Sequence, residues 1–320
     1  MVTILAARLP TALFHVSMTL PEHPVPSMDS AAVQRWARLA GGPSPWLHDE
    51  VGNRMAQRLS WIKATPATWM DWSPVRGGAA ARHIASDVYK NSDKLLPPSL
   101  SDIELKAIKK ANELDRSIWQ RLMRQGPSVA SADTRVGMLW ANMCLHDTHM
   151  PTSMIRQWHR HLAVDGFLMF SCLGPDTLTE LRALYARMGW QAPCHAYTDM
   201  HDWGDMLVAN GFNAPVMDVE RMVLSYASAE RLLQDLRQFG RNLSIERSRV
   251  TRGRRWRQRL VAELERGLPR TPDGQLMLTF EIIYGHAHKP PPSVKVADTS
   301  AISLDDMKQM LGTARQVGKR

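Results

Sequence analysis

The sequence predicts an α/β fold in which a doubly wound, mostly parallel sheet carries helices on both faces. Two continuous apolar runs of strand length, at 137–143 and 166–173, are typical of strands that are covered on both sides, as parallel strands are. Helical patterns alternate with the strand-like runs along the chain, which is the order of βαβ units. The 320 residues are enough for one large domain of this kind.

The chain divides by pattern into three parts. Residues 1–28 form an irregular leader, for which a later start at Met18 or Met28 is the alternative explanation. Residues 29–290 hold the alternating helices and strands. Residues 291–320 begin within a run of three prolines and form a polar tail.

The sheet is expected to open in the N-terminal third of the chain. Apolar residues at intervals of three or four predict a helix over 45–62. A β-prone run at 68–72 is followed by Gly77 and Gly78, and then by helix-forming residues over 79–90. Strand, glycine turn and helix make the start of a βαβ unit, and ligands of such sheets bind beyond the carboxyl ends of the strands.

The remaining elements complete the sheet and add a helical insertion before its last strand. Capping boxes, in which a Ser or Thr is followed three residues later by Glu, start two helices at Ser101 and Thr177. Strands are expected at 93–96, 137–143, 166–173, 216–226 and 276–284, and helices at 101–123, 154–162, 177–188, 202–210 and 228–240.

Cysteine, histidine and apolar patterns exclude several classes of protein. The three cysteines show no CxxC spacing, which argues against a disulfide framework or a zinc site and fits a reducing cytoplasm. The histidine pairs lack a carboxylate or cysteine at ligand spacing, so we expect no metal. No apolar window approaches the length of a membrane span.

The net charge of +9 is concentrated in an arginine run. The run consists of Arg241, Arg247, Arg249, Arg252, Arg254, Arg255, Arg257 and Arg259. Such a run attracts an anionic partner, which could be a nucleic acid, a coenzyme A phosphate or an acidic carrier protein; a solvated helix face is the alternative. Because no nucleic-acid-binding module is recognisable, we expect a partner other than nucleic acid.

Six segments stand in a distinctive order and spacing. They are MLWANMCLH at 138–146, WxxxL at 158–162 with GFLMFS at 166–171, LGPDTL at 173–178, TDMHDWGDML at 198–207, GF at 211–212 with PVMD at 215–218, and LTFEIIYGH at 278–286. In these segments the chain resembles the malonyl-thioester O-methyltransferases of biotin synthesis. The resemblance implies a class I S-adenosylmethionine methyltransferase fold. It also implies methyl transfer to the free carboxylate of a malonyl thioester on acyl carrier protein or coenzyme A.

The resemblance also implies where the donor S-adenosylmethionine binds. The family places an acid and a G-x-G-x-G run after the first strand, and Asp71 matches the acid. Gly77 then falls on the third glycine, with Gly78 beside it, and Asn142 matches the end of the fourth strand. A turn residue at the strand end is the alternative role for Asn142.

The glycine turn is eroded in this chain. Ser73 and Val75 stand where the family has its first two glycines, and Pro74 between them fixes φ and lacks an N–H. Val75 would be strained at a positive φ. Asp102 and Glu104 are candidates for the acid that binds the ribose, with helix capping as the alternative. A turn of the family's geometry cannot form here without change, which puts donor binding in doubt.

The acceptor side needs few residues. A carboxylate is already an ionised nucleophile, so no general base is required and no catalytic pair is assigned. The protein must align the acceptor and hold its charge with a cation. Arg241, Arg247 and Arg252 are the candidates. Two functions therefore follow: an active methyltransferase, or a methyltransferase-like protein that has lost donor binding and binds an acidic partner such as acyl carrier protein.

Overall fold

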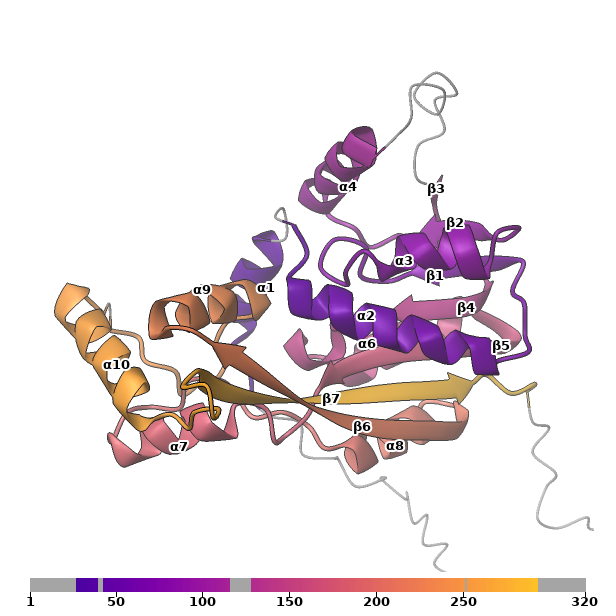
Figure 1. The fold of residues 1–320 in the computed structure, drawn as a ribbon. Helices are drawn as coiled ribbons and strands as arrows, with labels where there is room; N and C mark the ends of the chain where they lie inside the picture. The colour runs from indigo at the N-terminus through magenta and orange to yellow at the C-terminus, as the bar shows by residue number, and fades with distance from the viewer. Residues whose placement is uncertain (1–26, 40–42, 116–127, 251, 293–320) are drawn as a thin grey trace, which may run out of the picture. The chain divides into compact units, whose positions relative to one another are not determined.

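The computed structural model describes residues 27–39, 43–115, 128–250 and 252–292. The chain separates into two units, Met1–Pro290 and Pro291–Arg320. The first unit holds the helices and strands that the structure describes. This unit is built on a seven-stranded sheet of order β3-β2-β1-β4-β5-β7-β6 (Figure 1).

The predicted doubly wound, mostly parallel sheet is confirmed. β1 pairs in parallel with both β2 and β4, and β7 runs antiparallel to β5 and β6. The strands are β1 (Thr68–Asp71), β2 (Asp93–Leu96), β3 (Ser128–Val129), β4 (Val136–Ala141), β5 (Leu162–Leu173), β6 (Asn213–Tyr226) and β7 (Leu276–His288). Because the order reverses between β1 and β4, the carboxyl ends of these two strands flank the crevice where doubly wound sheets bind ligands.

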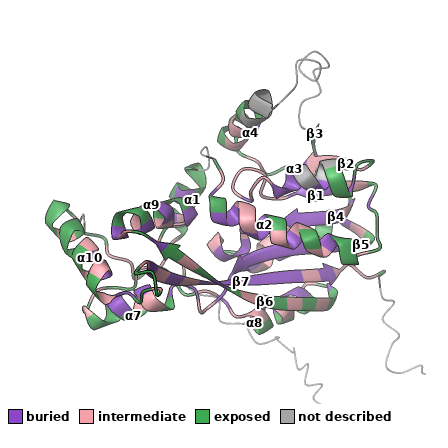
Figure 2. Ribbon diagram, in the orientation of Figure 1, coloured by how far each residue is buried: buried purple, intermediate pink, exposed green. Residues whose placement is uncertain are grey.

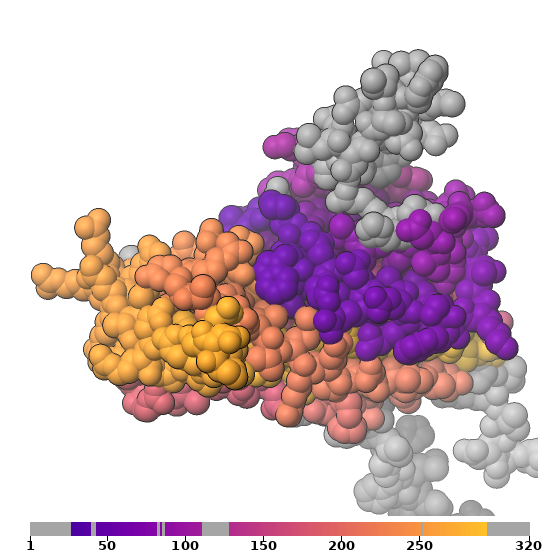
Figure 3. Space-filling model, in the orientation of Figure 1, coloured from indigo at the N-terminus to yellow at the C-terminus, as the bar shows by residue number. Residues whose placement is uncertain are grey.

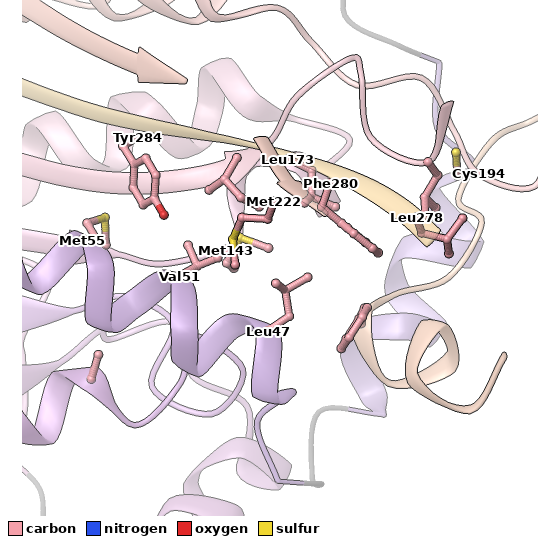
Figure 4. Close-up of a cluster of buried hydrophobic side chains, with 14 of the residues drawn as sticks. Leu47, Val51, Met55, Met143, Leu173, Cys194, Met222, Leu278, Phe280 and Tyr284 are labelled. Atoms are coloured by element: carbon pink, nitrogen blue, oxygen red, sulfur yellow. The ribbon is translucent and has the colours of Figure 1, made fainter. Parts of the chain in front are cut away.

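Helices cover both faces of the sheet (Figure 2). They are α1 (Ser30–Arg38), α2 (Trp46–Arg58), α3 (Ala80–His83), α4 (Asp102–Asp115), α6 (Pro151–His161), α7 (Thr179–Arg187), α8 (Met200–Ala209), α9 (Ala229–Phe239) and α10 (Arg254–Gly267). Successive residues of a strand point to opposite faces, so Trp69 packs in the cluster of α2, whereas Met70 packs with α6 and α8. Figure 4 shows α2 placing Leu47, Val51 and Met55 in the first cluster.

Local helix signals were correct at one capping box and wrong at the other. Ser101 and Glu104 cap α4 reciprocally, with Ser101 N–H 2.9 Å from Glu104 Oε2. Thr177, by contrast, does not cap α7: its hydroxyl donates to the Glu281 carbonyl at 3.2 Å, and Leu178 is the N-cap. Contacts with β7 replace the local cap. Of the predicted helix over 101–123, the part beyond residue 115 lies outside the described residues.

The helical insertion lies between β6 and β7. Leu173, the last residue of β5, pairs with Ile282, so residues 276–281 of β7 and their partners in β6 continue beyond the carboxyl end of β5 as a two-stranded ribbon. The ribbon carries α9 and α10, which Figure 1 shows together with α7 at this end of the sheet. The insertion is therefore beside the crevice.

Candidate donor and acceptor sites

The residues predicted for the donor site come together at the carboxyl ends of β1 and β4. Asn142 is fully buried and connects the end of β4 to the turn after β1. Its side-chain amide donates to the Gly77 carbonyl at 2.5 Å and the His48 carbonyl at 2.8 Å, and its oxygen accepts from the Ser171 hydroxyl at 2.5 Å. These three bonds use the donors and the acceptor of the amide within the protein.

Both surviving glycines are required by the packing of the turn. A Cβ on Gly77 would stand 2.5 Å from the Ser73 carbonyl oxygen. Gly78 has φ +89°, and a Cβ there would stand 2.9 Å from the Asp49 carboxylate. Neither Ser73 nor Val75 adopts a positive φ. The turn thus avoids the conformation that the missing glycines would have allowed.

The start of α2 is fastened to this turn. Asp49 Oδ1 accepts the Ala79 N–H at 2.6 Å, and His48 Nδ1–H donates to the Arg76 carbonyl at 2.7 Å. Gly52 lets α2 approach closely, because a Cβ there would stand 2.9 Å from Asn142 Nδ2. The start of α2 therefore packs directly against the turn.

The candidate acids differ in their surroundings: Asp102 is exposed at the start of α4, whereas Asp71 and Glu104 are bonded within the protein. Asp71 is buried and forms an ion pair with Lys94 of β2, with 2.9 Å between Nζ and Oδ2. β2 ends at the buried, apolar Leu96, and Glu104 is used as a helix cap. The amide of Asn142 is also satisfied internally, so in this arrangement Asp71 and Asn142 present no free polar group to a donor.

Three buried histidines stand beside this turn, and sequence reasoning gave them no role. Burial lowers the pKa of His146 to about 4, and it also lowers the pKa of His48 and His195. His146 Nδ1 accepts the Leu173 N–H at 3.3 Å, and His195 Nε2 donates to the His146 carbonyl at 3.0 Å. The available signal was the histidine four residues after Asn142, just beyond the end of a buried strand.

We expect stability to fall with acid because of these groups. His146 titrates near 4 in the folded protein but near 6.5 when unfolded, so the unfolded chain binds more protons between these values. The free energy of unfolding should decrease as the pH drops from 6.5 to 4, by up to about 1.4 kcal/mol per pH unit from His146. Urea unfolding of His146→Gln should show a shallower pH slope. Equal slopes for His146→Gln and the wild type would contradict the assignment.

The three predicted acceptor arginines have different surroundings. Arg247 forms an ion pair with Asp29 at 2.7 Å and donates to the Ser244 carbonyl at 3.0 Å, so it fastens the segment before α1. The Arg252 guanidinium lies 4.1 Å from the ring centre of Trp256. These two arginines thus have structural partners.

Arg241 donates to the carbonyls of Arg237 and, at 2.8 Å, Gly240, and it also lies beside a second arginine and an aromatic ring. The guanidinium carbons of Arg76 and Arg241 are 3.4 and 4.8 Å from the ring centre of Trp36. Trp36 in turn donates through Nε1 to Asp147 at 2.8 Å. Burial lowers the pKa of both arginines, and the charge of Arg241 lowers that of Arg76 further. Two like charges beside one ring, Arg76 half-buried and Arg241 exposed, form an arrangement that attracts a carboxylate.

Other features of the described residues contribute no further site residue. A groove of about 530 Å³ lies between α2 and β6 and contains none of the predicted donor or acceptor residues. Within the described ranges, no group of three or more His, Cys, Asp and Glu could hold a metal ion. No helix in these ranges is long and apolar enough to cross a membrane.

Known proteins resemble this chain over most of its length, although no protein-family model matches it. The malonyl-[acyl-carrier protein] O-methyltransferase of Laribacter hongkongensis is 36% identical over 76% of this chain and 83% of its own length. The protein of that name from Gallionella capsiferriformans is also 36% identical, over 86% of this chain and 95% of its own length.

Solved structures give more distant matches. N-methyltransferase NodS from Bradyrhizobium japonicum, in complex with S-adenosyl-L-homocysteine, has a TM-score of 0.41 and 13% identity over 81% of this chain and 99% of its own. The 1,6-didemethyltoxoflavin-N1-methyltransferase of Burkholderia thailandensis has a TM-score of 0.42 and 14% identity, over 84% and 94%.

Proposed function

The chain belongs to the malonyl-[acyl-carrier protein] O-methyltransferase family, and we propose that it methylates the free carboxylate of a malonyl group carried by acyl carrier protein, a step of biotin synthesis. The observation that carries this proposal is the identity of 36% over most of both chains. We place the reaction in a reducing cytoplasm, which the free thiols of Cys144, Cys172 and Cys194 support.

Methyl transfer to a carboxylate requires few catalytic groups from the protein. A malonyl carboxylate is ionised at neutral pH, so no base has to remove a proton. What remains is to hold the carboxylate in place without neutralising it, which a guanidinium does through charge-assisted hydrogen bonds. We assign this role to Arg241, with Arg76 on the same tryptophan as its partner.

The donor of this reaction is S-adenosylmethionine in our proposal, and Asp71, Gly77, Gly78 and Asn142 are its candidate residues. In the structure Asn142 is bonded to the carbonyls of Gly77 and of His48 in α2, and Asp71 is paired with Lys94. These contacts have to open before the residues can meet a donor.

We expect the wild-type protein to form malonyl-carrier methyl ester from labelled S-adenosylmethionine, and Arg241→Ala to raise KM for the malonyl carrier about tenfold. A hydrogen bond to a charged group contributes about 1.5–3 kcal/mol, and 1.4 kcal/mol corresponds to a factor of ten. Initial rates at varied carrier concentration measure the effect. Arg247→Ala should lower stability through loss of the Asp29 pair and leave KM near the wild-type value.

Two failures can be told apart. An unchanged KM for Arg241→Ala would remove the role of that residue and leave the reaction standing. Absence of methyl ester from the folded wild type, together with no binding of S-adenosylhomocysteine in titration calorimetry, would overturn the reaction itself. The chain would then be a carrier-protein binder without catalysis.

A further inference from the structure

The first half of α10 and the segment before it expose arginines that have no acidic partner. We call Arg249, Arg254, Arg255 and Arg257 the arginine surface; all four are exposed. None of them forms an ion pair with a carboxylate among the described residues. The second half of the helix differs, because Glu263 pairs with Arg266 at 3.5 Å.

The arginine surface is unfavourable for the helix that carries it. The positive end of the helix dipole favours acidic side chains in the first turn, yet the first turn of α10 contains no acid and its N-cap Gly253 provides no side-chain bond. Arg254 and Arg257 are like charges three residues apart, which repel. The helix is held instead by Leu260 and Leu264, which are buried. Positions that oppose helix stability point to a role outside the fold.

Neighbouring side chains hold the base of this surface. Trp256 and Trp190 have ring centres 5.8 Å apart. Arg252 lies over the first ring at 4.1 Å, and Arg259 lies 5.7 Å from the centre of the second. These contacts join α10 to the segment after α7, so the exposed arginines project from a packed base. Figure 3 shows the surface of α9 and α10 open to solvent in this view.

The place of the surface relates it to the acceptor site. α10 and Arg241 belong to the same insertion, which the ribbon of β6 and β7 holds beyond the carboxyl end of β5. A malonyl group on a carrier protein arrives at the end of a flexible thioester-bearing arm, so the carrier body has to dock beside the acceptor site rather than in it.

We propose that the arginine surface docks the acyl carrier protein, an acidic helical protein, so that its arm reaches Trp36 and Arg241. The inference rests on the proposed function and deepens it by assigning the partner to a surface. Charge complementarity selects this occupant, since four unpaired guanidinium groups attract a carrier rich in Asp and Glu.

The test reverses the charge of three exposed arginines, in the variant Arg254→Glu, Arg255→Glu, Arg257→Glu. Its KM should rise at least tenfold for the malonyl carrier protein and stay unchanged for malonyl-pantetheine, which has the arm without the protein. The wild-type KM for the carrier should increase with ionic strength, because salt screens exposed charges. A KM that rises equally for both substrates would mean damage to the acceptor site and would overturn the docking role.

A matched control carries the same change of net charge elsewhere. Lys106, Lys109 and Lys110 are exposed on α4, and their replacement by Glu should leave both KM values as in the wild type. An equal effect of the two triple variants would overturn the proposal. Surface plasmon resonance with the holo carrier protein measures docking without catalysis. Carrier binding that the α10 variant loses would support the surface even if the wild type transferred no methyl group, and equal binding by both would overturn it.

Discussion

Replacing Gly285 with alanine should lower the free energy of unfolding by about 3 kcal/mol, at the upper end of the usual range for overpacking. A Cβ at this position of β7 would stand 2.0 Å from Cε1 and 2.3 Å from Cζ of Phe170, its register partner in β5. The Phe170 ring is fully buried and packs at 5.9 Å from Trp158, so it has no free space to move into.

Urea unfolding followed by tryptophan fluorescence measures this effect. Gly240→Ala is the matched control, because φ is −175° and a Cβ there would meet nothing within 4 Å. Phe170→Leu combined with Gly285→Ala should recover part of the loss, since the smaller side chain removes the overlap. A wild-type midpoint for Gly285→Ala alone would contradict the packing described for these two strands.

Asn142→Ala should be the second severe substitution, with a loss of about 3 kcal/mol or more. It leaves the carbonyls of Gly77 and His48 and the hydroxyl of Ser171 without their buried partner. Each buried group left unsatisfied costs about 1–3 kcal/mol. The expected drop in the urea midpoint should be accompanied by loss of methyl transfer, because the same side chain holds the turn after β1.

The exposed Asn53→Ala on α2 is the control for this substitution and should unfold like the wild type. If Asn142→Ala unfolded at the wild-type midpoint while losing S-adenosylhomocysteine binding, the amide would serve the cofactor rather than the fold. That result would contradict the structural role and restore the interpretation drawn from the family resemblance.

Much of the sheet could be predicted because the sequences of its central strands are unbroken apolar runs. Parallel strands bury both faces, so the runs at 137–143 and 166–173 indicated β4 and β5 without further context. Turns and caps were less certain, because a distant contact can replace a local bond. Thr177 shows this: its hydroxyl bonds a strand that follows about a hundred residues later.

The donor and acceptor residues were predictable as positions but not as partners. The sequence places Asn142 at a strand end, yet it contains no sign that α2 supplies one of its bonds. Likewise, the ion pair of Arg247 with Asp29 joins segments more than two hundred residues apart. Which arginine remains available to a substrate is decided by such long-range contacts, and spacing along the chain does not encode them.

The ribbon formed by the ends of β6 and β7 has a consequence for how this protein can diverge. The register that fixes the sheet is complete where Leu173 meets Ile282, and α9 and α10 are attached beyond that point. Lengthening, shortening or recharging the insertion therefore leaves the pairing of the central strands untouched. Natural selection can reshape the surface that meets other molecules while the inherited scaffold stays the same.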